Sequence, residues 1–276
     1  MYIKLSKVSE ISRFQSRFSE EVIEIAAVTG ALGTSAGRAG NDKLWIASIE
    51  LIAWKTLHIH NDEPTKKEET RLQWLADDKE WQETRNMIDA YAVVKLQVRR
   101  GENAMMLVDL LDLAYEDNEL ERILEDAKKP VYYHDEILGE FTLEKGVNLF
   151  EKRTSWNGEE CYLCFDWNED SPIMKSALET AHILFKEENE WDRKIRMYVA
   201  EELVELANDW LQEDDETEVD EITKEMFINS IKVTSISVDP DGEFTIYFSD
   251  GDMFGGHCII VDGNVSGVFN GAEIAG

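Results

Sequence analysis

The segment Asp250-Gly-Asp-Met-Phe-Gly-Gly-His257 contains the side chains best suited to chemistry. Asp250, Asp252 and His257 supply two carboxylates and an imidazole, a set that could hold one divalent cation and activate a water on it. The glycines between them permit backbone conformations that turn side chains inward. Asp-Gly is equally typical of a β-turn, so the same residues also fit a hydrogen-bonded structural loop or a partner-binding loop.

The three cysteines indicate ordinary thiols. Cys161-Tyr-Leu-Cys164 matches C-x-x-C, but we expect it in a β-strand, where residues three apart point to opposite faces. Cys258 directly follows His257, and neighbouring strand residues also face opposite sides, which disfavours a catalytic dyad. Three cysteines are too few for a disulfide framework and fit a reducing compartment.

The stretch 30–40 is rich in glycine and follows a predicted strand, as phosphate-binding loops do. It matches neither G-x-G-x-x-G nor G-x-x-x-x-G-K-[ST], and Lys43 lies too far along to serve as the phosphate-binding lysine. A flexible loop is the favoured interpretation, with nucleotide binding as the alternative.

Nothing else in the chain predicts catalytic residues. His58 and His60 lie two apart and share a strand face, but a third metal ligand is missing. Neither G-x-S-x-G nor H-E-x-x-H occurs. We therefore expect a protein that is not an enzyme and needs no cofactor, unless the 250–257 segment binds a divalent metal.

Charge is distributed unequally along the chain. Residues 1–130 hold 18 Lys and Arg against 24 Asp and Glu, whereas residues 131–276 hold 10 against 34, so the net charges are −6 and −24. Such a field repels nucleic acid and anionic membranes and attracts basic proteins. Arg99 and Arg100 with Lys95 form the main basic patch, too small for nucleic-acid binding. Solubility is the alternative explanation of the acidic excess.

The densest run of acids follows a predicted helix. Like-charge repulsion should keep this run an exposed loop, and we predict that it contacts a basic protein partner. The candidate partner-binding residues are Glu213, Asp214, Asp215, Glu216, Glu218 and Asp220.

Periodicity and turn signals divide the chain into two domains, 1–133 and 134–276. The first is predicted to be mixed α+β, with its role open. Its expected helices cover 4–18, 78–88 and 117–129, and its expected strands cover 22–28, 44–54 and 92–98.

The second domain is predicted to be an α+β unit with a hairpin, two amphipathic helices and an antiparallel β-meander. Asn157-Gly158 favours a type I′ hairpin turn, and Ser171-Pro172 resembles an N-cap followed by proline at the first helical position. The main helices are expected at 173–186 and 191–212. Apolar residues recur at three- and four-residue spacing along the second of these, from Trp191 to Trp210 and Leu211, and this stripe is predicted to form core. A short helix is expected at 223–229, and strands at 232–238, 244–248, 257–261 and 265–269, the last two flanking Asp262-Gly-Asn264.

Several segments of this half resemble one family. They are Ser155-Trp-Asn-Gly-Glu-Glu160, Ala200-Glu-Glu-Leu-Val-Glu-Leu-Ala-Asn-Asp-Trp-Leu211, Glu221-Ile-Thr-Lys-Glu-Met-Phe227 and the tail Phe248-Ser-Asp-Gly-Asp-Met-Phe-Gly-Gly-His257. Together they are similar to the bacterial domain of unknown function 2262 family over residues 137–276. Gly255 departs from the pattern, which has a bulky aromatic there. The N-terminal half suggests no family.

The resemblance implies an uncharacterised cytoplasmic bacterial domain with no catalytic residues to transfer. Relatives look like members of the small-protein repertoire around bacterial toxin and immunity systems. A cytoplasmic location also fits the lack of eighteen uninterrupted apolar residues and of an apolar signal core near Met1 to Glu10. The resulting prediction is a non-enzymatic, immunity-type binding or inhibitor protein for a basic partner, with a metal-binding domain or hydrolase using Asp250, Asp252 and His257 as the alternative.

Overall fold

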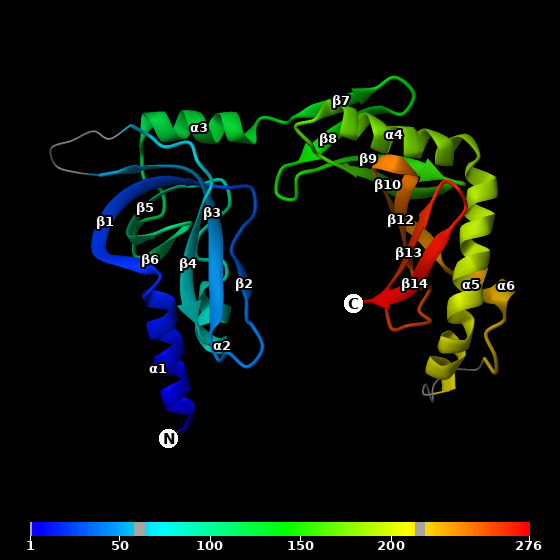
Figure 1. Cartoon of the computed structure of the whole chain (residues 1–276), viewed down its shortest axis with the longest axis horizontal. Coiled ribbons are helices and arrows are strands. Elements are labelled where there is room, and N and C mark those ends of the chain that lie inside the picture. The colour runs from blue at the N-terminus through cyan, green and yellow to red at the C-terminus, as the bar shows by residue number, and fades with distance from the viewer. Residues whose placement is uncertain (1, 58–63, 213–218) are drawn as a thin grey trace. The chain divides into compact units, whose positions relative to one another are not determined.

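The computed structural model describes residues 2–57, 64–212 and 219–276. The chain folds as two compact units, an N-terminal unit (Met1–Lys129) and a C-terminal unit (Pro130–Gly276) (Figure 1). Both combine helices with extensive sheet, which confirms the α+β class. No helix in these described ranges combines the length and the apolar character needed to cross a membrane.

The N-terminal unit is a closed sheet. Its strand order is β1-β5-β6-β4-β3-β2, and β1 also pairs with β3, so the five longer strands return on themselves. Closure leaves few unpaired edge groups. The elements are α1 (Tyr2–Gln15), β1 (Phe18–Thr29), β2 (Ser35–Gly37), β3 (Trp45–Thr56), β4 (Thr70–Ala76), α2 (Asp78–Thr84), β5 (Val93–Gly101), β6 (Ala104–Asp112) and α3 (Asn118–Lys128).

Alternation along the strands of this unit separates two apolar clusters. Ile25 and Ala27 of β1 belong to the larger cluster, whereas Ala26 and Val28 pack with Leu120 of α3. Because successive strand residues face opposite sides, one strand thus serves both the larger cluster and the layer under α3. Asp117 begins α3 by accepting bonds from the amides of Glu119 and Leu120.

The helices and strands predicted for this half are all present, with shifted ends. Three strands, β2, β4 and β6, were not predicted. The glycine-rich stretch 30–40 also differs from the flexible loop that we expected, because β2 within it pairs with Ser48 to Ile46 of β3. A strand and not a helix follows these glycines, so the strand–loop–helix context of a phosphate-binding loop is not met.

The C-terminal unit is an eight-stranded sheet with helices packed against it. All neighbouring strands are antiparallel except β10 and β11, which are parallel and are joined by α4, α5 and α6. The elements are β7 (Tyr132–Asp135), β8 (Gly139–Glu144), β9 (Leu149–Trp156), β10 (Glu159–Asp166), α4 (Ser171–Lys186), α5 (Glu188–Gln212), α6 (Lys224–Ser230), β11 (Lys232–Val238), the 3-10 turn η1 (Pro240–Gly242), β12 (Glu243–Ser249), β13 (Cys258–Asn264) and β14 (Phe269–Ala275).

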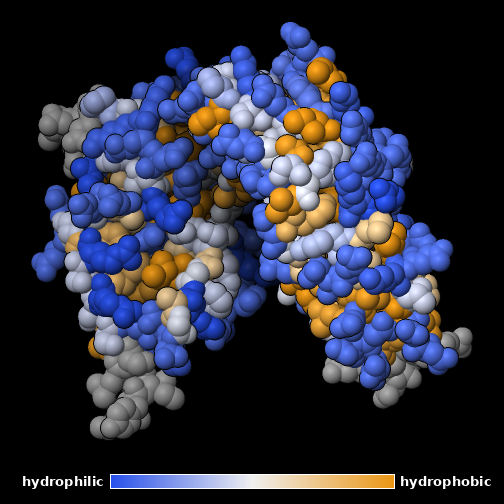
Figure 2. Space-filling view, turned by 45° about the vertical axis from the view of Figure 1, so that its right-hand side comes forward, coloured by the Kyte–Doolittle hydropathy of each residue, from blue (hydrophilic) through white to orange (hydrophobic). Residues whose placement is uncertain are grey.

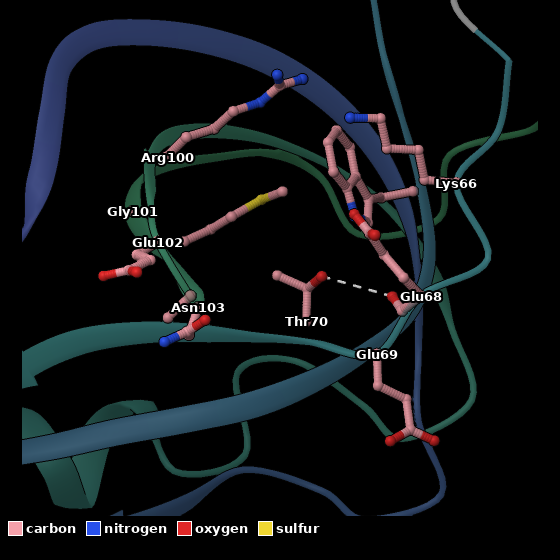
Figure 3. Close-up of a pocket in the computed structure, with 11 residues that line it drawn as sticks. Lys66, Glu68, Glu69, Thr70, Arg100, Gly101, Glu102 and Asn103 are labelled. Atoms are coloured by element: carbon pink, nitrogen blue, oxygen red, sulfur yellow. Dashed lines mark hydrogen bonds between the residues drawn. The ribbon is translucent and has the colours of Figure 1, made fainter.

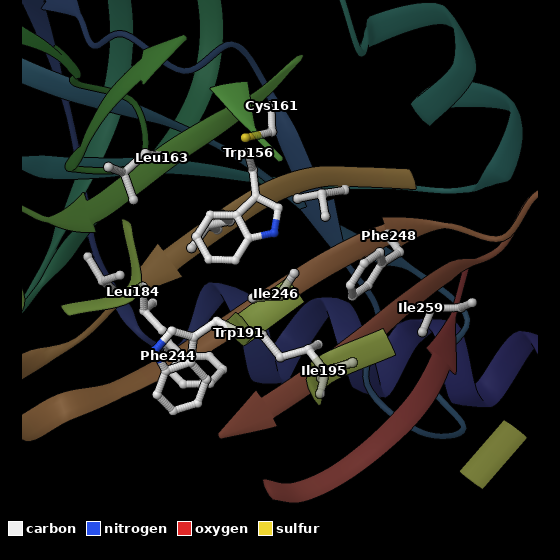
Figure 4. Packing of buried hydrophobic residues seen from close by; sticks show 14 of the residues in the cluster. Trp156, Cys161, Leu163, Leu184, Trp191, Ile195, Phe244, Ile246, Phe248 and Ile259 are labelled. Carbon is white, nitrogen blue, oxygen red and sulfur yellow. The ribbon is translucent and has the colours of Figure 1, made fainter. Parts of the chain in front are cut away.

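One large apolar core fills the space between this sheet and its helices. Figure 4 shows Trp191 and Ile195 of α5 facing Phe244 and Ile246 of β12, with Trp156 close by. The rings of Trp191 and Phe244 meet edge to face at 5.9 Å between centroids. The apolar stripe predicted for this helix therefore forms core, as amphipathic spacing indicates.

Most turns of the second domain were predicted correctly. Asn157 and Gly158 both have positive φ (48° and 86°), as a type I′ turn requires. The N-cap of α4 was predicted one residue late, because the helix includes Ser171 and its N-cap is Asp170. The amide of Asp170 donates to Asn168 Oδ1 and so turns the chain before the helix.

The last hairpin was predicted in the wrong register. We expected a turn at Asp262-Gly-Asn264 and a strand at 265–269, but β13 continues through Asn264 and β14 begins at Phe269. A side chain on Gly263 would approach the rings of Phe244 and Phe269 to 2.9 Å, so glycine here permits close aromatic packing and does not mark the turn. Asn264 makes the real turn, with its side-chain oxygen accepting from Ser266.

A buried ion pair joins α5 to the rest of this unit. Arg196 Nε donates to both carboxylate oxygens of Asp192 at 2.9 and 3.0 Å. The indole N–H of Trp156 and the side-chain amide (Nδ2) of Asn157 donate to the same carboxylate, each at 3.0 Å. Both charged residues are buried, and these bonds satisfy the carboxylate.

The remaining donors of Arg196 reach the end of α6 and Glu159 of β10, and Glu159 in turn holds the start of β11. One terminal nitrogen donates to the carbonyls of Ile228 and Ile231 at the end of α6, at 3.1 and 2.6 Å. The other donates to Glu159 Oε2 at 2.9 Å, and that oxygen also accepts the amide of Val233 in β11. One side chain thus fixes α5 to the β9–β10 hairpin, the end of α6 and the start of β11.

Replacing Arg196 with Met should lower the free energy of unfolding by about 3–5 kcal/mol, because Asp192 would stay buried without its cation. Urea unfolding followed by tryptophan fluorescence measures the change. Lys194→Met is the matched control, since Lys194 lies on the same helix but pairs with Glu190 at the surface. Equal unfolding midpoints for the two variants would contradict the central role of Arg196.

Candidate functional site

A hollow of about 440 Å³ opens at the far end of α5 in the C-terminal unit. Three segments line it: the last turn of α5, the region from Val219 to α6, and the β12–β13 connection. Figure 2 shows hydrophobic side chains gathered in the lower part of this unit, bordered by hydrophilic ones. The apolar lining residues are Trp210, Leu211, Val219, Ile222, Met226 and Met253, and the polar ones include Ser230 and Asp252.

Trp210 is the largest exposed side chain of this hollow. It is 37% exposed, and its ring meets Phe254 edge to face at 5.7 Å and His257 at 5.5 Å between centroids. Phe254 is fully buried and in turn contacts Phe227 of α6. The indole therefore rests on a rigid aromatic base while presenting part of its surface outward.

The buried side chain of Asp250 holds the β12–β13 connection together by accepting its backbone amides. Its side chain is buried (4% exposed) and accepts the amides of Asp252, Phe254 and Gly256 at 3.1, 2.8 and 2.9 Å. Gly251 has φ +60°, and a side chain there would lie 2.6 Å from the carbonyl oxygen of Ser230. The loop thus closes tightly against the end of α6, and only glycine fits at its first bend.

The other two candidates of this segment point elsewhere. Asp252, at φ +66°, is exposed and lines the hollow. His257 is half-buried, with Nδ1 bonded to the carbonyl of Phe254 and its ring against Trp210. Within the described ranges no three His, Cys, Asp or Glu residues are grouped to hold a metal ion. A metal site at Asp250, Asp252 and His257 stays a prediction, and this geometry lends it no support.

Only the end of the predicted acidic segment lies within the described residues. Glu213, Asp214, Asp215, Glu216 and Glu218 lie outside the described residues. Asp220 is exposed, and its neighbours Val219 and Ile222 line the hollow. The side chain of Asn208 in α5 holds the chain at Ile222. It accepts the backbone amide of Ile222 at 2.8 Å and donates to the carbonyl of the same residue at 2.9 Å. The end of the acidic segment and the 250–257 segment therefore line one hollow.

Sequence reasoning missed the apolar part of this site. Trp210 was assigned to the core stripe of the helix, and Met226 and Met253 were not singled out. One signal could have indicated an exposed position for Trp210. This residue lies in the final turn of the helix, directly before a run of acids, and an apolar stripe that continues so far reaches the surface. Met226 is also exposed (42%), although it lies on a helix whose Phe227 is fully buried.

The two cysteines of the C-x-x-C match were predicted to be ordinary strand thiols. Cys161 and Cys164 both lie in β10, which confirms the predicted strand, and both are buried. Burial raises the pKa of the Cys161 thiol to about 11 and also raises that of Cys164. His58 and His60 lie outside the described residues.

Comparison with known families gives the class of this chain. Residues 135–274, half of its length, match the family described as "Uncharacterized protein conserved in bacteria (DUF2262)", and the chain belongs to that family. This confirms the resemblance of the C-terminal half. Residues 10–127 match a second model, "Domain of unknown function (DUF7021)", so the N-terminal half does have a recognisable family, contrary to our expectation. No curated protein and no solved structure matches the chain.

Native Cys161 and Cys164 should resist alkylation at pH 8, because burial keeps both thiols protonated and out of reach of reagent. Iodoacetamide labelling followed by peptide mass spectrometry should modify half-buried Cys258 first and the other two only after unfolding in urea. Equal labelling rates of all three thiols in the native protein would contradict this order.

Asp250→Ala should destabilise the C-terminal unit by about 1–3 kcal/mol, because three loop amides lose their acceptor. Thermal unfolding measures the loss, with Asp252→Asn as control, since Asn tolerates the positive φ at that position. The same scans with added divalent cation test the metal hypothesis. A metal site would raise the Tm of the wild type but not that of Asp250→Ala.

Proposed function

We propose that this protein is a non-enzymatic binding protein of the immunity or inhibitor type, which holds a basic protein partner at the hollow beside Trp210. The observation that carries the proposal is a partly exposed tryptophan in an apolar hollow, next to acids, on a unit of net charge −24. The family match itself assigns no activity.

Apolar lining and acidic surroundings have different roles in such an interface. Trp210, Met226 and Met253 offer a hollow into which one apolar side chain of a partner fits. Tryptophan is among the residues that most often dominate binding energy, especially when bordering residues exclude water. Asp252 lines the hollow and Asp220 follows the lining residue Val219, so both add negative charge beside that anchor.

The net charge of the unit favours fast capture of a basic target. Complementary fields raise association rates at low salt and lose effect as ionic strength rises, whereas a buried apolar anchor mainly sets the dissociation rate. A nuclease that is basic because it must bind nucleic acid is one class of target that fits. Binding would then be steered by charge and retained by the hollow.

Trp210→Ala should weaken binding to the basic partner at least tenfold, because the anchor loses its aromatic wall. The full chain is immobilised and exposed to basic proteins encoded beside its gene in the producing bacterium, with binding measured by biolayer interferometry at low and moderate salt. Trp167→Ala is the matched control, since Trp167 is 40% exposed in the same unit but does not line the hollow.

Met226→Ala guards against a folding defect, because Met226 is exposed and its truncation should leave Tm unchanged. It should also weaken binding, whereas Asp252→Asn should slow association and reduce its salt dependence. A basic partner that binds Trp210→Ala and Met226→Ala as tightly as wild type would overturn the proposal. So would binding that does not respond to salt.

A further inference from the structure

Strand β14 (Phe269–Ala275) forms an open edge of the C-terminal sheet. Within the part of the chain that the structure describes, it pairs with β13 alone, and none of its seven residues is buried. Five consecutive residues, 271–275, lie in regular register with β13. In a strand that is paired on one side, every second residue directs its N–H and C=O groups to the other side. This edge therefore offers a row of hydrogen-bonding groups to an added strand.

The edge lacks the features that usually prevent such pairing. Native sheets protect their edges with proline or lysine, or by making the edge strand short. The opposite edge follows this rule, because β7 has four residues and begins two residues after Pro130. Strand β14 has seven residues and contains neither proline nor lysine, and its charged residue is the exposed Glu273. The longer edge is therefore suited to strand addition, a common mode of peptide recognition.

An acidic face of α5 runs beside this edge. The ring of Tyr198 stacks on Phe269 at the start of β14, with 4.8 Å between the centroids. Residues four, seven and eleven positions further along a helix share the face of the first. Here they are the exposed acids Glu202, Glu205 and Asp209. Residues 197–212 hold four acids and residues 243–276 hold five, and neither range contains lysine or arginine. Such a border attracts a basic chain.

The far end of β14 reaches the hollow beside Trp210. A side chain on Gly276 would lie 3.0 Å from the ring of His257, and that ring meets Trp210 at 5.5 Å between centroids. From Tyr198 to Trp210 the helix rises about 18 Å, and the length of β14 is about 20 Å. The acidic helix face and the strand edge therefore run side by side and end at the same hollow (Figure 1).

The hollow of the N-terminal unit offers a basic chain no comparable surface. It has a volume of about 440 Å³ and is shown in Figure 3. Lys66 Nζ lies 4.5 Å and Arg100 Cζ lies 4.7 Å from the centroid of the Trp54 ring. The carboxylates of the same lining are Glu68, Glu69 and Glu102. Charges of both signs are thus mixed around this hollow, and they give a basic chain no consistent attraction.

We propose that the basic partner binds as an extended segment that adds a strand to the open edge of β14. Alternate basic side chains of this segment meet the acidic face of α5, and an apolar side chain at its end enters the hollow beside Trp210. The inference rests on the proposed function, because it assumes a basic partner at that hollow. It adds the conformation of the bound segment and a second surface that recognises it.

Synthetic peptides test strand addition on the full chain. The probes are two capped peptides in which lysine alternates with threonine, with leucine at either the first or the last position. Isothermal titration at low salt measures their binding. Methylation of every second backbone nitrogen removes the donors on one side of a strand only. One alternate set should abolish binding of the better probe, and the other should leave its affinity within about threefold. Equal effects of the two sets, or no binding of either probe, would overturn strand addition.

Charge reversal and hydrogen exchange locate the bound peptide. Glu202→Lys should weaken the better probe about tenfold at low salt, because its lysines then face a cation. Glu140→Lys is the matched control, since Glu140 is exposed on β8 near the opposite edge of the sheet. The amides of 271–275 should exchange more slowly when the probe is bound. Wild-type affinity in Glu202→Lys, or unchanged exchange of these amides, would refute binding at β14.

Strand addition and the hollow can fail separately. Loss of peptide affinity in Trp210→Ala, with no difference between the two methylated sets, would retain the hollow as the partner site and refute strand addition. A clear difference between the sets, with wild-type affinity in Trp210→Ala, would retain strand addition and refute the hollow as the anchor.

Discussion

The bond between Arg196 and Asp192 is the constraint on which the C-terminal unit depends. A buried arginine and carboxylate are costly to desolvate, and they are tolerated only when every donor and acceptor is satisfied. Here the carboxylate accepts from Trp156, Asn157 and Arg196. The guanidinium donates to Asp192, to Glu159 and to two carbonyls at the end of α6. Because these partners belong to separate elements, the pair forms only when hairpin, helices and sheet are all in place.

The hollow beside Trp210 follows from that constraint. Arg196 fixes the carbonyls of Ile228 and Ile231, and this places the end of α6. Ser230 at that end lies against Gly251, so the β12–β13 connection closes over it. Asp250 then gathers the amides of the connection and sets Phe254 under Trp210. The 250–257 segment, which the sequence marked as a candidate metal site, therefore supports the surface of the hollow beside Trp210.

Local signals in the sequence were sufficient for most elements and insufficient for closure and register. Asn157-Gly158 and the apolar stripe of α5 depend on neighbouring residues only, and both were predicted correctly. The closed N-terminal sheet depends on β1 pairing with both β3 and β5, which no local pattern encodes. Gly263 was misread because close aromatic packing and a tight turn both favour glycine. Likewise, an aspartate among glycines fits either a cation site or a loop whose amides the carboxylate accepts, so the sequence around Asp250 could not distinguish the two.

The hollow beside Trp210 favours one kind of ligand by its chemistry. Its lining is largely apolar and the charges lie around it, so most of the available binding energy comes from excluding water from a protruding side chain. A small polar ligand gains little from such a lining, because its polar groups would lose water without finding new partners. This geometry therefore favours a macromolecule that presents an apolar side chain over a small polar ligand.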